Sequence, residues 1–229
     1  MQQADEIRLF PTSIWTMELN DCNDFNLNFQ KYIYDLKSQS EDHIERSNKG
    51  GWHSPNLDYN NIFISKFFNK LDPIIKSLMS QLNWDIENFR IGYQELWSII
   101  NSKDDFNFPH RHGDSLLSLA YYVKVPKNDD GGSIYFVDPR VAAISRKPPV
   151  RMNKDLRKDI ISFGKTHNQG KYMIKPKEGM LIIFPSWLEH GVYPNQSDED
   201  TIVISANINL YPAKNPQSIT HTPISTYQP

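Results

Sequence analysis

The chain has 229 residues and a formal net charge of −2, and 38% of its residues are hydrophobic. This length is enough for one domain with a substantial core. The near-zero charge gives no electrostatic case for binding nucleic acid or an anionic membrane. A polar, acidic start and the lack of a long apolar run predict neither a signal peptide nor a membrane anchor. The single cysteine, Cys22, excludes an internal disulfide and favours the reducing cytoplasm.

The first 90 residues are expected to form a helical support region. One amphipathic pattern runs from Asp24 to about Glu45, and a second runs from about Tyr59 to Leu82. Pro73 should kink the second helix or mark a boundary in it. Such apolar stripes usually pack on a neighbouring sheet, so we expect both helices to support one face of a β structure.

The region 91–211 is expected to form the β core. Aromatic and β-branched runs predict strands at 116–125, 133–137, 180–185 and 201–209, separated by turns rich in Gly, Pro, Asn and Asp. No helices alternate with these strands, which favours an antiparallel jelly roll or barrel. The predicted fold is therefore mainly β with flanking helices (α+β), a cupin-like double-stranded β-helix barrel in a single domain.

Two further segments are expected to lie outside this core. The basic stretch of about 141–170 is too long for a plain hairpin connection, so it is either a lid over the barrel mouth or a solvated insert. The tail 212–229 is polar and contains prolines, without periodicity.

The sequence Phe-Pro-His-Arg-His-Gly-Asp-Ser at 108–115 is the most informative motif. His112 and Asp114 are two residues apart, so an extended strand would place both on one side. With His190 returning on a neighbouring strand, they predict the two-histidine, one-carboxylate ligand set of non-heme Fe(II) oxygenases. His110 is also two residues from His112, so an alternative set of His110, His112 and His190 stays open, and such all-histidine sites bind other metals as well.

Five segments occur in a familiar order: His112-Gly113-Asp114-Ser115, Ala120-Tyr121-Tyr122-Val123, Gly131-Gly132-Ser133-Ile134, Lys177-Glu178-Gly179-Met180 and His190-Gly191-Val192-Tyr193-Pro194. In this order they resemble the 2-oxoglutarate/Fe(II)-dependent dioxygenase superfamily, in particular its prolyl-hydroxylase-like branch. Other segments resemble, more narrowly, a group of oxygenases found in marine bacteria and their phages: Ser47-Asn48-Lys49-Gly50-Gly51-Trp52-His53-Ser54, Leu96-Trp97, Val137-Asp138-Pro139-Arg140 and Phe184-Pro185-Ser186-Trp187-Leu188.

The resemblance implies an enzyme that hydroxylates a C–H bond with Fe(II), 2-oxoglutarate as co-substrate and dioxygen, with ascorbate as an auxiliary reductant. It assigns the metal to His112, Asp114 and His190, and it places Tyr122 beside the co-substrate. Thr201 occupies the position where the family usually has an arginine for the far carboxylate of 2-oxoglutarate.

A buried carboxylate without a cation or several donors is costly, so another residue should replace that arginine. If Tyr122 points inward, the period of two along a strand sends Lys124 inward as well, which makes Lys124 the expected substitute. Arg140, Arg146 and Arg151 are alternatives from the following insert.

Four residues are expected near the substrate or behind the metal ligands: His110, Trp187, Arg140 and Trp97. An aromatic groove would suit peptidyl proline, and a small-molecule substrate is equally compatible with the fold. The alternative function is a cupin-like metal-binding protein without 2-oxoglutarate turnover. A third is a zinc or manganese enzyme that uses His110. We expect a monomer or a homodimer.

Overall fold

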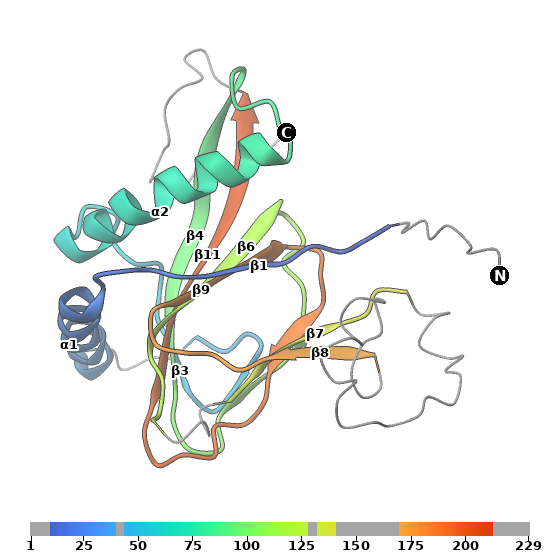
Figure 1. Cartoon of the computed structure of the whole chain (residues 1–229). Coiled ribbons are helices and arrows are strands. Elements are labelled where there is room, and N and C mark those ends of the chain that lie inside the picture. Colours follow the sequence, from blue (N-terminus) through green and yellow to red (C-terminus); the bar gives the residue numbers. More distant parts are fainter. Residues whose placement is uncertain (1–9, 40–43, 128–131, 141–169, 213–229) are drawn as a thin grey trace.

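Two antiparallel sheets and two helices make up the chain in the computed structural model, which describes residues 10–39, 44–127, 132–140 and 170–212 (Figure 1). The mainly β fold with flanking helices is confirmed, but the sheets do not close into a barrel. The segment 141–169, which contains Arg146 and Arg151, and the tail 213–229 lie outside the described residues, so the expectations for them stay predictions. No helix in the described part is long and apolar enough to cross a membrane.

The larger sheet has six strands, and its longest pair joins β4 (Phe89–Asn101) and β11 (Thr201–Pro212) over their whole lengths. The predicted strands at 116–125, 180–185 and 201–209 all belong to this sheet, whereas β4 was not predicted as a strand. In spatial order the strands are β1 (Trp15–Glu18), β9 (Met180–Pro185), β6 (Leu117–Lys124), β11 (Thr201–Pro212), β4 (Phe89–Asn101) and β3 (Trp52–His53).

The smaller sheet has five short strands and carries His110 and His190. Of its strands, only the one at 133–137 was predicted from an apolar run, whereas a strand carrying His190 was expected from the metal-binding motif. In spatial order the strands are β2 (Asn48–Lys49), β5 (Phe106–His110), β10 (His190–Val192), β7 (Ile134–Val137) and β8 (Lys171–Ile174).

Both predicted helices are present and shorter than expected. Helix α1 spans Asn23–Gln39 and helix α2 spans Ile62–Gln81. The side chain of Asn61 caps α2 by accepting a hydrogen bond from the backbone N–H of Phe63 at 2.9 Å. Pro73 lies inside α2, which continues through it, so it does not mark a helix boundary.

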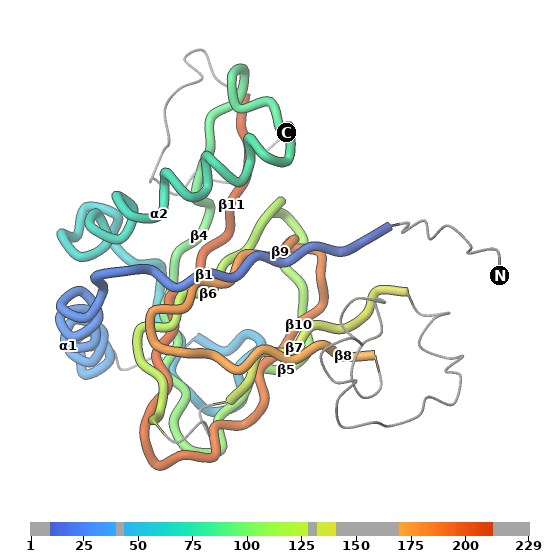
Figure 2. Tube along the Cα trace, in the orientation of Figure 1, coloured from blue at the N-terminus to red at the C-terminus, as the bar shows by residue number. Residues whose placement is uncertain are grey.

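Strand β6 shows how the large sheet separates two apolar cores. Tyr121 and Val123 pack with the helices in one core, whereas Ala120 and Tyr122 pack with residues of the smaller sheet in the other. Because side chains alternate along a strand, the two adjacent tyrosines face opposite layers. The helices thus cover the outer face of the large sheet, and the inner face is left for the smaller sheet (Figures 1 and 2).

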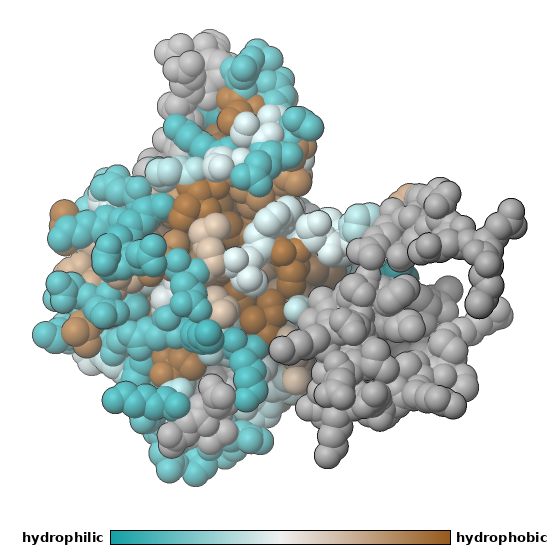
Figure 3. Space-filling view, viewed as in Figure 1, coloured by the Kyte–Doolittle hydropathy of each residue, from teal (hydrophilic) through white to brown (hydrophobic). Residues whose placement is uncertain are grey.

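The surface follows the same division. On the face shown in Figure 3, hydrophilic residues cover most of the helical side, and apolar residues gather in the middle, where β1 and β9 pass beneath α2.

A tight turn after Arg46 joins the two sheets. Strand β2 pairs with β5 of the smaller sheet, and β3 pairs with β4 of the larger one. Gly50 and Gly51 between them have φ values of 63° and 65°, a region that disfavours residues with a Cβ. A Cβ on Gly51 would also meet the carbonyl oxygen of Ile100 at 2.9 Å. The segment 47–55 is therefore a crossing between the sheets.

Candidate metal centre and pocket

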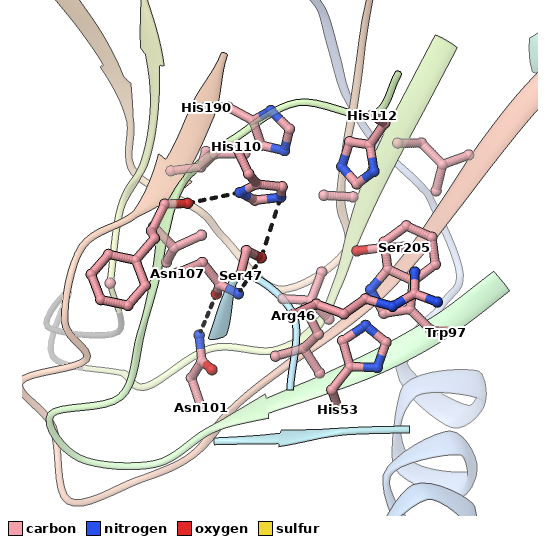
Figure 4. Close-up of a pocket in the computed structure, with 18 of the residues that line it drawn as sticks. Arg46, Ser47, His53, Trp97, Asn101, Asn107, His110, His112, His190 and Ser205 are labelled. Atoms are coloured by element: carbon pink, nitrogen blue, oxygen red, sulfur yellow. Dashed lines mark hydrogen bonds between the residues drawn. The ribbon is translucent and has the colours of Figure 1, made fainter. Parts of the chain in front are cut away.

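Three histidines meet between the sheets. His110 ends β5, and its Cα partner across the sheet is His190, the first residue of β10. His112 follows two residues later. The three side chains each offer a nitrogen, and these nitrogens lie within 4.8 Å of one another (Figure 4). This arrangement offers three ligand atoms to one metal ion.

Two of the imidazoles are held in the tautomer that suits a metal. The Nδ1 atom of His110 lies 2.7 Å from the carbonyl oxygen of Phe108, and that of His190 lies 2.9 Å from the carbonyl oxygen of Leu188. Since a carbonyl can only accept, both Nδ1 atoms carry the proton, and each Nε2 atom keeps its lone pair. The Nε2 lone pair of His110 accepts a long hydrogen bond from the hydroxyl of Ser47 at 3.4 Å, which a metal ion would replace. A backbone carbonyl behind a histidine is the usual support of a metal ligand.

His112 is positioned by a polar network on the inner face of the large sheet. Its backbone N–H donates to the carbonyl oxygen of Ser186 at 2.9 Å, and its Nδ1 lies 3.4 Å from the side-chain nitrogen of Asn207. Asn207 also donates to Glu95 at 3.0 Å and accepts from the hydroxyl of Ser118 at 2.8 Å. The ring is therefore supported by β4, β6 and β11 together.

Burial keeps the three imidazoles neutral. Loss of solvent lowers the pKa of His190 to about 3 and that of His112 to about 4, with His110 as the next cause in both cases. The pKa of His110 is also lowered by burial. Neutral imidazole is the form that binds metal, so no proton has to leave at neutral pH.

Asp114 lies apart from the three histidines. It is exposed, it is not among the residues that line the cavity, and its carbonyl oxygen accepts a hydrogen bond from Asn209 at 2.6 Å. Strand β5 ends at His110, and residues 113 and 114 form a turn. The period of two that aligned His112 with Asp114 in the sequence does not apply to a turn.

A cavity of about 430 Å³ opens beside the histidines. It contains three of the other predicted residues, Trp97, Tyr122 and Thr201. Its apolar walls include Phe184, Ile134 and Val192. Sequence reasoning missed further lining residues: Arg46, Ser47, His53, Asn101, Asn107 and Ser205.

Besides Asp114, three predicted residues do not line this cavity. Trp187 is half-exposed, and Arg140 forms a two-point ion pair with Asp138, at 2.8 and 3.0 Å. Lys124 is also outside the lining. In the pairing of β6 with β11, Lys124 lies opposite Ile202 and Tyr122 lies opposite Val203, so the register shifts by one residue between these two pairs. This irregularity breaks the alternation that would have turned Lys124 inward.

The end of the cavity around Thr201 is neutral. Thr201 pairs with Asn101 across β11 and β4, and both residues are buried and line the cavity. Burial raises the pKa of Tyr122, so its hydroxyl keeps its proton and can donate a hydrogen bond. No lysine lines the described cavity, and its arginines are Arg46 and Arg111.

The middle of the chain matches a known protein-family model. Residues 95–207 match the model described as "Putative 2OG-Fe(II) oxygenase". This range contains all three histidines of the centre, together with Tyr122 and Thr201. The comparison with curated protein sequences finds no match.

Solved structures share the fold at low sequence identity. A prolyl-4-hydroxylase of Pseudomonas putida superposes with a TM-score of 0.60 at 11% identity, covering 86% of this chain and 92% of that chain. HygX of Streptomyces hygroscopicus, with nickel and 2-oxoglutarate bound, gives 0.59 at 12% identity, covering 86% and 83%. The alpha-ketoglutarate-dependent epimerase SnoN from nogalamycin biosynthesis gives 0.58 at 12% identity, covering 86% and 76%.

These similarities confirm the predicted jelly-roll class, as two facing sheets without a closed barrel. They also confirm the resemblance to prolyl hydroxylases and their relatives. The similarity to the 2OG-Fe(II) oxygenase family thus extends over residues 95–207, the part of the chain that carries the three histidines.

Proposed function

We propose that the protein is an Fe(II)- and 2-oxoglutarate-dependent dioxygenase that hydroxylates a C–H bond. The observation that carries the proposal is the convergence of three neutral imidazoles at one end of a cavity, within the segment that matches the oxygenase family. Three protein ligands leave positions on the metal for a co-substrate and dioxygen.

We assign the metal to His110, His112 and His190. Their nitrogens lie within 4.8 Å of one another, whereas Asp114 is exposed in a turn outside the cavity. The ligand set is thus the all-histidine alternative in place of the set that includes Asp114. Three imidazoles without a carboxylate give the centre one negative charge fewer, which favours binding of an anionic co-substrate.

The cavity supplies the remaining groups for 2-oxoglutarate. The hydroxyl of Tyr122 offers a donor, and Thr201 and Asn101 add polar groups at the far end. Fe(II), 2-oxoglutarate and dioxygen together supply the oxidising power, and that chemistry belongs to the cofactors. The protein's part is to hold the groups in place and to keep water away with walls such as Phe184 and Val192.

The prime substrate is a peptide or a small molecule. The similar structures include a prolyl-4-hydroxylase and an epimerase, so the fold accommodates more than one reaction. Peptidyl proline is our first candidate, on the prolyl-hydroxylase likeness. We place the protein in the reducing cytoplasm, on the buried free thiol of Cys22.

The second candidate is a cupin-like metal-binding protein without turnover of 2-oxoglutarate. The neutral far end of the cavity favours it, because the described lining has no cation at Thr201 to pair with the far carboxylate.

Release of carbon dioxide from 2-oxoglutarate labelled at C1 separates the two candidates. The proposed function predicts release that requires both Fe(II) and dioxygen and that is lost in His190→Ala. Tight Fe(II) binding without any release, across a panel of proline-containing peptides and small molecules, would support the binding protein instead.

A further inference from the structure

The cavity has positive charge at the end that holds the metal centre. Among the described residues its lining includes Arg46 and Arg111 and no aspartate or glutamate. A narrow site lined by one sign of charge concentrates ligands of the opposite sign.

Both arginines pair with a glutamate, and Figure 4 shows that Arg46 extends into the pocket toward Trp97 and His53. Arg111 is mostly exposed and its Nη2 lies 3.0 Å from Glu189. Arg46 is half-exposed, and only its Nη1 contacts Glu95, at 3.4 Å from both carboxylate oxygens. Within the described part of the chain its Nε and Nη2 have no hydrogen-bond partner. Since a guanidinium has five N–H donors, one edge of Arg46 is available to a second anion while Glu95 steadies the side chain.

The position of Arg46 identifies which ligand it can reach. Its partner Glu95 lies opposite Asn207, whose side chain contacts the ring of His112. Along β4 and β11, Arg46 therefore lies at the same height as the metal centre. Thr201 is six residues farther along β11 than Asn207, about 20 Å at the usual rise of a strand, so Arg46 does not serve the Thr201 end.

A flat aromatic wall stands beside the guanidinium. The rings of His53 and Trp97 are stacked with centroids 5.7 Å apart and planes 7° from parallel, and both residues line the cavity. Figure 4 shows the side chain of Arg46 extending toward these two rings and Ser205, on the side of the pocket where His112 lies. A planar apolar group beside an anion would fit this surface.

We propose that Arg46 determines substrate specificity by binding a carboxylate of the prime substrate, so that the peptide or small molecule carries this carboxylate next to the part that lies against Trp97. The proposal rests on the proposed function for the identity of the neighbouring metal centre. The planar fork of arginine matches a carboxylate through two parallel hydrogen bonds, which a neutral amide cannot reproduce.

Matched acids and amides test this assignment without knowledge of the true substrate. The full chain is loaded anaerobically with Mn(II) and 2-oxoglutarate and titrated by calorimetry with benzoate against benzamide, and with N-acetylglycine against N-acetylglycinamide. We expect each acid to bind at least about tenfold more tightly than its amide, as a charge-assisted pair should. Arg46→Gln should abolish the preference, and Arg46→Lys should restore part of it.

Arg111→Gln is the matched control, because it removes the other arginine of the lining and should keep the preference. The proposal is overturned if the wild type shows no preference for acids, if the preference survives in Arg46→Gln, or if Arg111→Gln loses it equally. The titrations are repeated with Mn(II) alone, and binding of 2-oxoglutarate is measured in each variant. A chain that binds no 2-oxoglutarate but keeps the Arg46-dependent preference would refute the proposed function and leave this proposal standing.

Discussion

His110 and His190 are prepared for a metal by atoms of the backbone. The carbonyl oxygen of the residue two positions earlier, Phe108 or Leu188, accepts a hydrogen bond from Nδ1 of each ring and so fixes the proton on that atom. His112 lacks such a carbonyl and depends on Asn207 instead. The orientation of the His112 ring thus depends on one side-chain amide from the last strand of the large sheet.

Replacing Asn207 should therefore weaken metal binding. In Asn207→Ala we expect a loss of about 10- to 100-fold in Fe(II) affinity, as is typical for a partner behind a metal ligand. Anaerobic titration measures it. Asn209→Ala is the control, because Asn209 lies on the same strand but donates to Gln94 and to the backbone of Asp114. An equal loss in both variants would mean that Asn207 has no special part in holding His112.

The buried histidines should make the metal-free protein sensitive to acid. Their pKa values are lowered, to about 3 for His190 and about 4 for His112, so the unfolded chain takes up protons at a higher pH than the folded one. The free energy of unfolding should fall as the pH drops from about 6.5 toward 4, by up to about 1.4 kcal/mol per histidine for each pKa unit of difference. Urea unfolding at several pH values measures this, and a flat profile between pH 6.5 and 4 would contradict it.

At the scale of residues, the sequence identified side chains whose local pattern was informative. His112, His190, Tyr122, Thr201 and Trp97 all reach the cavity. The expected inclusion of Asp114 assumed that the strand continues past His110, which the turn prevents. Arg46 and Asn207 could not be anticipated, because their roles depend on contacts between strands that are far apart in the sequence.

Strand β6 carries two adjacent tyrosines whose side chains lie on opposite faces of the large sheet. The hydroxyl of Tyr121 donates to the buried side chain of Asn26 in α1 at 2.8 Å, whereas Tyr122 faces the cavity. Helix α1 is thus tied to the sheet directly behind the proposed co-substrate site.

Matched phenylalanine variants should separate the two faces. Tyr121→Phe should lower the free energy of unfolding by about 1–2 kcal/mol, because Asn26 loses a buried partner, without changing the affinity for 2-oxoglutarate. Tyr122→Phe should weaken 2-oxoglutarate binding with little change in stability. Chemical unfolding and calorimetry of both variants measure the two effects, and exchanged results would mean that the strand faces are assigned the wrong way round.

Element type was predictable wherever one periodicity dominated. The runs at 116–125, 180–185 and 201–209 are continuous apolar or alternating patterns, and all three are strands. Strand β4 was missed because Arg90, Gln94 and Glu95 interrupt its apolar pattern. Lys124 does not line the described cavity, and the irregularity in strand pairing beside it leaves no signal in a sequence read by alternation alone.

For the whole molecule, the metal should act as a clamp between the sheets. His110 and His190 belong to the smaller sheet, whereas the network around His112 belongs to the larger one. A ligand bound only by the folded state stabilises it by about 2.7 kcal/mol at 100 times its dissociation constant. Thermal unfolding under anaerobic conditions should therefore show a midpoint that rises with Fe(II) in the wild type and stays constant in His190→Ala. A midpoint that rises equally in both would place the metal elsewhere.

The division between the sheets also explains what the sequence could not provide. Local patterns indicated strands, helices and a jelly-roll class, but not that the sheets stay open and are joined by the crossing at Gly50 and Gly51. That crossing brings Arg46, Ser47 and His53 to the cavity from a region that was expected to be a helical support region.

The central claim is that three histidines hold the metal and that Asp114 does not. Anaerobic Fe(II) titration of His110→Ala and Asp114→Ala, beside the wild type, tests it most directly. We predict that His110→Ala lowers Fe(II) affinity by at least about tenfold, because metal binding depends on the count of preformed ligands, and that Asp114→Ala binds as the wild type does. Loss of affinity in Asp114→Ala with wild-type binding in His110→Ala would contradict the account.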